Sequence, residues 1–215
     1  YIDADTEIGR GDLMERVFQA LETDGKLYQV GSTFRIMTLT GASSVVGEDM
    51  TWTPADFWAA LASMPDGAIP LVNSGSKDRM LKELLNLGGD RFVDWEEGTC
   101  RFDSEEFKDL LTFCNSFPNQ DALRDVTDIT GMVSGMQMLC EWQLTDFYAV
   151  QKMAFLFGGA VTFVGYPNEW GEVGSAFYLP SSYAISSASA HKDGAWAFLR
   201  TLLLPNTSAN VFREF

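Results

Sequence analysis

The sequence predicts an α/β protein in which a mostly parallel sheet is covered by helices on its faces. Two observations support this prediction. Segments with helical periodicity alternate along the chain with short apolar segments typical of strands. In addition, 46% of the 215 residues are hydrophobic and 13% are aromatic, which is ample for a packed core.

Five segments have the apolar spacing of a helix with one buried face. They are residues 12–23, a segment that starts at Thr53, and residues 76–87, 107–117 and 144–157. Thr53-Pro54-Ala55-Asp56 and Asp103-Ser104-Glu105-Glu106 have the pattern of a capping box, which predicts a helix start. The helix after Thr53 is expected to bury Phe57, Trp58 and Leu61.

Segments typical of strands lie between these helices. They are residues 27–39, 68–72, 136–141 and 161–164, with a weakly alternating segment at 92–102. Asp24-Gly25 is expected to end the first helix in a turn, and the polar stretch 119–130 is expected to form a loop.

Composition limits the possible partners. Thirty acidic and fifteen basic residues give a formal charge of -15, and Lys and Arg form no cluster, so nucleic acid is excluded as a partner. No apolar run reaches the length of about 18 residues that a membrane-spanning helix needs. The three cysteines, Cys100, Cys114 and Cys140, are odd in number and far apart, which predicts buried free thiols.

Candidate catalytic and metal sites find little support. His191 is the only histidine and lies in a polar lead-in to a helix, so we expect it on the surface. Asp94, Glu96 and Glu97 resemble glycosidase carboxylates only in type, because neighbouring side chains of an extended segment point to opposite faces. The segment 73–77 lacks the first glycine of a phosphate loop. We therefore expect no catalytic residue, no cofactor and no metal.

Two tryptophans are candidate ligand-binding residues. Trp142 and Trp170 lie in predicted short connections beside strand ends, where α/β sheets place ligand crevices. Polar residues flank both, in Glu141-Trp142-Gln143 and Asn168-Glu169-Trp170. A sugar ring has an apolar face and a rim of hydroxyls, so a flat aromatic ring beside polar groups suits it. Trp142 is equally compatible with the core, whereas Trp170 is expected to be exposed or to face a ligand.

Five motifs follow one another along the chain: Asp24–Tyr28, Trp52–Phe57, Phe92–Phe107, Val164–Pro167 and Tyr183–Leu203. Their order resembles that in the extracellular solute-binding proteins of carbohydrate ABC importers, the family that includes the maltodextrin-binding protein. Each motif is weak alone, but together they span nearly the whole chain. Gly31-Ser32 replaces a proline found in many members, and His191 replaces an Asn or Lys.

The resemblance implies a class II periplasmic-binding-protein-like fold with two lobes and a ligand cleft between them. Residues 1–33 would be a first-lobe piece with the outgoing crossing, 34–164 the main α/β lobe, and 165–215 the return crossing with a first-lobe helical piece. By placement in the family, the expected ligand-binding residues are Phe34 and Arg35 on the outgoing crossing, together with Trp142 and Trp170.

The function implied by the resemblance is capture without catalysis. The protein would bind a small solute, a sugar or oligosaccharide, and deliver it to the membrane permease of an ABC transporter. It would be a monomeric lipoprotein on the extracellular face of the cytoplasmic membrane. The chain opens at Tyr1 without Met or a signal-peptide pattern, so we expect it to be an excised fragment.

Two other functions remain open from the residues. One is a carbohydrate-active enzyme that uses Asp94 or Glu97. The other is a protein-interaction domain without a small ligand, in which Trp170 forms part of the contact patch. The class of solute is open as well, because relatives on this architecture bind peptides, polyamines or iron complexes.

Overall fold

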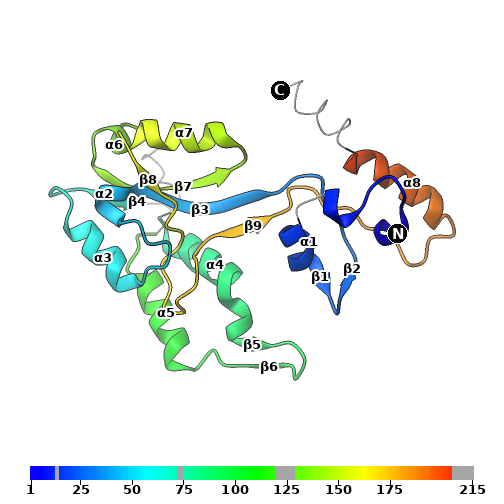
Figure 1. The fold of residues 1–215 in the computed structure, drawn as a ribbon. Coiled ribbons are helices and arrows are strands. Elements are labelled where there is room, and N and C mark those ends of the chain that lie inside the picture. Colours follow the sequence, from blue (N-terminus) through cyan, green and yellow to red (C-terminus); the bar gives the residue numbers. More distant parts are fainter. Residues whose placement is uncertain (13–14, 72–74, 120–128, 205–215) are drawn as a thin grey trace. The chain divides into compact units, whose positions relative to one another are not determined.

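The structure, a computed structural model, describes residues 1–12, 15–71, 75–119 and 129–204. The chain forms two compact units (Figure 1). The first contains Tyr1–Arg35 and the chain from Tyr178, and the second contains Ile36–Phe177. The lobe boundaries predicted after residues 33 and 164 stay a prediction.

The first unit consists of short helices and one hairpin around a small core. Its elements are η1 (Ile2–Ala4), η2 (Arg10–Asp12), α1 (Glu15–Leu21), β1 (Glu22–Thr23), β2 (Lys26–Leu27) and α8 (Lys192–Leu203). Its core cluster is formed by the buried apolar residues Ile2, Ile8, Phe18, Val30 and Leu203. Asp24 and Gly25, with φ of 52° and 68°, form the tight turn between β1 and β2. The turn expected at this dipeptide therefore closes a hairpin.

One mixed sheet organises the second unit. It contains β3 (Arg35–Ala42), β4 (Ile69–Leu71), β7 (Gln137–Leu144), β8 (Val161–Thr162) and β9 (Ala176–Tyr178). The order is β4-β7-β3-β8, and β9 also pairs with β3. β3 is antiparallel to β7 and β8, whereas β4 and β7 are parallel. The expectation of a mostly parallel sheet was wrong, because hydrophobic periodicity does not encode strand direction.

Helices cover both faces of this sheet (Figure 1). On one face lie α3 (Pro54–Ala62), α4 (Lys77–Gly88) and α5 (Glu105–Asn115), and on the other lie α6 (Thr130–Val133) and α7 (Phe147–Leu156). The connecting elements are α2 (Ser43–Val46), η3 (Gly89–Arg91), and the hairpin strands β5 (Val93–Asp94) and β6 (Thr99–Cys100). The α/β class expected from the sequence is confirmed.

Each face of the sheet has its own core. The larger cluster, on the side of α3, α4 and α5, includes Leu39, Phe57, Met80, Leu84 and Leu139. The smaller cluster, on the side of α6 and α7, is formed by Met132, Met153 and Leu156. None of the helices in the described ranges has the length and apolarity of a bilayer-crossing segment.

Several local expectations need correction. Trp58 is 36% exposed, because the helix after Thr53 turns only Phe57 fully inward. Ser104 caps α5 through the N–H of Phe107, but no capping box forms there because position N3 is a phenylalanine. Cys100 is an exposed free thiol, whereas Cys114 is buried and Cys140 is half-buried. Expected loop residues 120–128 lie outside the described residues.

The capping box at Thr53 is confirmed and gives a test of the fold. The Thr53 N–H donates to Asp56 Oδ2 at 2.9 Å, and the Asp56 N–H donates to Thr53 Oγ1 at 3.2 Å. We expect Thr53→Ala to lower the free energy of unfolding by about 1 kcal/mol in urea titrations. Thr51→Ala, in the exposed turn before the helix, is the control and should change it by less than about 0.5 kcal/mol. Equal losses in both variants would contradict the capping role.

Candidate functional site

The carboxyl ends of β4 and β7 form the candidate site. These strands are parallel, so their carboxyl ends point the same way; β4 ends opposite Leu139, β7 continues to Leu144, and each is followed by a helix. Ser76 caps α4, and Asp146 caps α7 by accepting the Ala149 N–H at 2.8 Å. In open α/β sheets, ligands bind in the crevice outside the carboxyl ends of the strands. We call this region the carboxyl edge.

The start of β3 lies at the same edge. β3 runs antiparallel to β7, and its residue Ile36 pairs with Leu144 near the end of β7. Arg35 is the first residue of β3, and Phe34 precedes it. Both side chains are half-buried and both belong to the first unit, whereas Trp142 and Trp170 belong to the second.

Consecutive side chains of β7 point to opposite faces of the sheet. Glu141 points toward α4, where it forms an ion pair with Arg79. Trp142 packs instead against the small core under α7. Trp142 therefore lies within the strand, and the expectation of a short connection at this position was wrong because β7 runs three residues further than the apolar pattern indicated.

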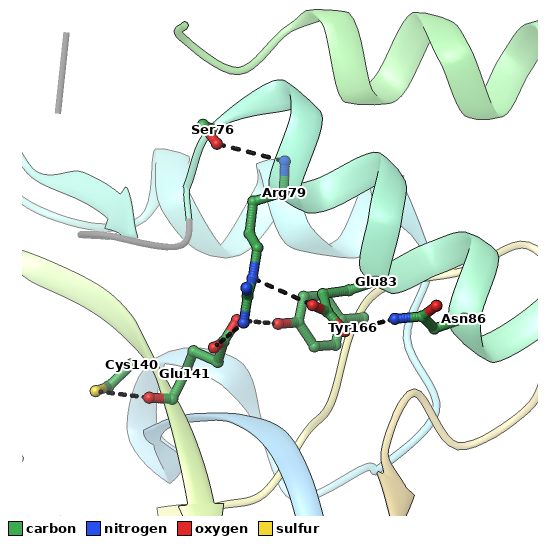
Figure 2. Close-up of polar contacts among 7 residues, drawn as sticks. All are labelled: Ser76, Arg79, Glu83, Asn86, Cys140, Glu141 and Tyr166. Carbon is green, nitrogen blue, oxygen red and sulfur yellow. Dashed lines mark hydrogen bonds and ion pairs between the residues drawn. The ribbon is translucent and has the colours of Figure 1, made fainter. Parts of the chain in front are cut away.

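A buried polar cluster links α4, β7 and the chain after β8 (Figure 2). Arg79 Nη2 lies 2.9 Å from Glu141 Oε1, and Arg79 Nε lies 3.1 Å from Glu83 Oε1. The Tyr166 hydroxyl donates to the other oxygen of Glu141. The two glutamate side chains are only 11% and 13% exposed. We call these four residues the Arg79 cluster.

The charge states of the Arg79 cluster follow from burial and from its carboxylates. Burial alone would lower the pKa of Arg79, but the negative charges of Glu141 and Glu83 raise it overall. Burial above all, and then the charge and hydrogen bond of Glu141, raise the pKa of Tyr166. Arg79 is therefore charged and Tyr166 neutral at physiological pH. Removing one partner of such a buried pair typically costs about 3–5 kcal/mol.

Two close backbone contacts place Tyr166 in this cluster. Gly165 has a φ of 74°, and its carbonyl accepts the Trp52 indole N–H at 3.0 Å. The Tyr166 N–H donates to the Gly174 carbonyl at 2.7 Å. A Cβ on Gly174 would overlap the Tyr166 backbone, so both positions need glycine.

Trp142 is half-buried, with one side of its ring covered. Lys152 Nζ, on the second turn of α7, lies 4.6 Å from the ring centroid, which is a cation–π contact. The indole Nε1 is buried and has no hydrogen-bond partner among the described residues. An unmet buried donor costs about 1–3 kcal/mol. Both interpretations of Trp142 therefore stay open. Its ring packs against the small core, and its indole N–H has no polar partner among the described residues.

Phe147 and Tyr148, which the sequence reasoning missed, stand in the first turn of α7. They are 90% and 72% exposed, unusually high for aromatic side chains. They come shortly after the carboxyl end of β7 and directly after Asp146, the N-cap of α7. A signal existed in the sequence, because both positions fall off the inward stripe of Ala149 and Met153.

Trp170 lies at the other end of α4. Its ring packs against Gly88 and against Phe92, at 6.4 Å between ring centroids, and the Arg91 guanidinium lies 5.2 Å above it. Gly88 is nine residues beyond Arg79 on α4, about 14 Å along the helix axis. The contacts of Trp170 therefore do not bring it to the carboxyl edge. It lines a separate cavity of about 440 Å³.

The groups weighed for catalysis have local structural roles. Asp94 accepts the backbone N–H groups of Glu96 and Glu97, both at 3.0 Å, in an exposed turn. His191 is exposed at the start of α8. Burial raises the pKa of Cys140 to about 11 and of Cys114 to about 12, so neither thiol is ionised at neutral pH. Among the described residues, no group of three or more His, Cys, Asp or Glu is arranged to hold a metal ion.

The raised pKa of Tyr166 makes the stability of the protein pH-dependent at high pH. The unfolded-state pKa is near 10.0 and the folded-state pKa is higher, so the unfolded chain loses the proton first. The contribution of the neutral Tyr166 phenol to the free energy of unfolding is complete below the unfolded-state pKa. Above that pKa it falls by up to about 1.4 kcal/mol per pH unit, until the folded-state pKa is passed. Urea titrations from pH 8 to 11 should show this decline in the wild type and a shallower one in Tyr166→Phe. Tyr28→Phe, at an exposed position, is the control. Parallel curves for the wild type and Tyr166→Phe would contradict the buried neutral phenol.

The contact between Gly88 and Trp170 gives a second test. A Cβ on Gly88 would lie 2.8 Å from Trp170 Cε3 and closer still to two other ring carbons. We expect Gly88→Ala to displace the indole and to lower the free energy of unfolding by about 1–3 kcal/mol. Gly89→Ala is a matched control, because that position has helical backbone angles and no atom within 4 Å of the added carbon. If the two variants are equally stable, the packing of Trp170 on α4 is wrong.

Comparison with known proteins places this fold. No family model and no curated protein matches the sequence. Among solved structures, the sugar-binding protein MalE from Xanthomonas citri is similar, with a TM-score of 0.64 and 16% identity over 98% of this chain and 57% of that one. A solute-binding protein of an ABC transporter from Agrobacterium vitis S4, with bound D-mannitol, has a TM-score of 0.59 and 17% identity over 99% and 56% of the two chains.

A third similar structure is the ABC substrate-binding protein from Listeria monocytogenes in complex with cycloalternan, with a TM-score of 0.58 and 15% identity. The match covers 95% of this chain and 55% of that one. The chain thus spans little more than half the length of the proteins that it matches. It has the periplasmic-binding-protein-like fold of the sugar-binding proteins of ABC transporters, as the motif order in the sequence predicted.

Proposed function

We propose that the protein containing this chain captures a sugar or oligosaccharide in a cleft between two lobes and delivers it to an ABC transporter permease. The observation that carries this proposal is the shared fold. Seven solved sugar- or solute-binding proteins match 92–99% of the chain, with TM-scores from 0.50 to 0.64. No bond is made or broken in this function.

The arrangement of the chain supports a mechanism of lobe closure. The chain passes from the first unit to the second after Arg35 and returns after Phe177. Two such crossings make a hinge, as in other proteins that close around a ligand. A solute that touches both lobes binds the closed form more tightly and shifts the population toward it. The permease would then recognise the closed, loaded form.

The carboxyl edge supplies groups that suit a sugar. Phe147 and Tyr148 offer exposed flat faces to the apolar side of a ring. Trp142 adds an indole N–H that has no partner within the described part of the chain, and Arg35 adds a guanidinium at the start of β3. We therefore propose Arg35, Trp142 and the neighbouring Phe34 as ligand-binding residues, as expected from the sequence. Trp170 stays a candidate only through its own cavity.

The position of the protein in the cell follows from the proposed function. A protein that delivers solute to an importer must bind the solute outside the cell, so we place it on the extracellular face of the cytoplasmic membrane. A lipid anchor would hold it near the permease, and it would act as a monomer. These three statements rest on the proposed function.

A thermal-shift screen of the natural full-length protein tests this proposal. The panel contains monosaccharides, oligosaccharides, amino acids and polyamines. A ligand at about 100 times its dissociation constant adds about 2.7 kcal/mol to the free energy of unfolding and raises Tm by several degrees. We expect one sugar class to shift Tm. A shift with another solute alone would overturn the carbohydrate assignment, and no shift with any solute would overturn the capture function.

Variants in the same screen locate the site. Trp142→Phe keeps the apolar packing but removes the indole N–H, and we expect it to reduce the sugar-induced shift relative to its own unliganded Tm. Trp95→Phe is the matched control, because Trp95 is 77% exposed in the β5–β6 hairpin. An unchanged shift in Trp142→Phe, in a protein that does bind sugar, would remove Trp142 from the site but leave the function standing.

A further inference from the structure

We infer that the second unit has a separate binding site, the cavity beside Trp170, which takes a small organic cation with an apolar body, such as an arylalkylamine. The cavity has a volume of about 440 Å³ and lies between α4, α5 and the turn at residues 167–170. Pockets for small ligands typically measure about 300–1,000 Å³, so its size suits one such molecule.

The floor of the cavity is apolar. Leu84 of α4 is fully buried, Phe113 of α5 is 8% exposed, and Pro167 closes the floor from the turn. The buried Asn168 also lines the cavity, but its amide is already bonded to the backbone of Tyr166, Trp170 and Glu172. A ligand therefore needs an apolar body to fill this space.

The rim of the cavity is acidic and uncompensated. Glu106 and Asp109 come from one face of α5, three residues apart, and Glu169 comes from the turn. All three are exposed, and none makes an ion pair or side-chain hydrogen bond with another described residue. The described residues that line the cavity include no Lys, Arg or His. A cationic head group at this rim would therefore be attracted by three carboxylates.

Trp170 gives the cavity a wall that already holds a cation. Its indole is fixed between Gly88 and Phe92, and the Arg91 guanidinium lies 5.2 Å from its ring. Arg91 in turn pairs with Glu172, so its charge is offset. Arg91 already holds a cation–π position on this ring, so the indole offers a ligand an apolar surface and the carboxylates of the rim attract its charge. A rigid aromatic wall beside free carboxylates selects an organic cation over a neutral sugar.

The cavity is distinct from the carboxyl edge. Its α4 residue, Leu84, comes five residues after Arg79 and next to Glu83, and its other walls come mainly from α5 and the turn, none of them from β4 or β7. The inference therefore does not rest on the proposed sugar function, and either can fail alone.

Isothermal titration calorimetry on the full-length protein at low salt tests the site with three probes of one shape. Phenethylamine is a cation, 2-phenylethanol is its neutral counterpart, and phenylacetate is an anion. We expect heat of binding for phenethylamine and none for the other two at the same concentrations, with weaker binding as salt is added. Equal binding of the amine and the alcohol would overturn the cation assignment, and no binding of the amine at millimolar concentration would overturn the site.

Variants separate the site from general attraction to an acidic protein. The double variant Glu106→Gln with Asp109→Asn removes two charges of the rim and should weaken phenethylamine binding by at least about fivefold. Glu105→Gln is the matched control on the same helix, since Glu105 pairs with Lys108 and does not line the cavity. Its affinity should equal that of the wild type. An equal loss in the control would show unspecific charge attraction and overturn the site.

A competition experiment separates this site from the sugar cleft. The double variant should keep any sugar-induced rise in Tm, and a saturating sugar should leave phenethylamine affinity unchanged. Displacement of the amine by sugar would place both in one site and overturn the inference.

Discussion

The antiparallel pairing of β3 with β7 is the constraint on which the second unit depends. Its register, from Ile36 opposite Leu144 to Gly41 opposite Leu139, decides which side chain of β7 meets which helix layer. A slip of one residue would turn Glu141 toward α7 and Trp142 toward α4. Arg79 and Tyr166 would then lose the Glu141 carboxylate, which both of them contact. The Arg79 cluster therefore fixes the register as much as it depends on it.

Much of the fold could be predicted from local patterns. The helix starts at Thr53 and Ser76 were visible because capping depends on residues within one turn of each other. The periplasmic-binding-protein-like fold was predicted from the order of motifs. Strand direction and the true end of β7 could not be predicted, since both depend on partners far away in the chain.

The candidate site was only partly predictable, for the same reason. Trp142 was identified because tryptophan beside polar residues is a visible pattern. The Arg79 cluster was not, because Arg79 and Glu141 are 62 residues apart in sequence and no spacing rule joins them. Trp170 was expected to be exposed or to face a ligand. It is half-buried against Gly88, about 14 Å along the helix from Arg79. A sequence shows that a residue is unusual but not which neighbours it meets.

The course of β3 and β9 makes the second unit a transferable module. It is one uninterrupted stretch of chain, Ile36–Phe177, whose first and last strands pair with each other and are joined near their ends by the Thr38–Ser175 hydrogen bond of 2.8 Å. Its two ends thus leave from neighbouring strands, which lie about 5 Å apart in a sheet. A module with adjacent ends can be inserted into a surface loop of an unrelated host without stretching either protein.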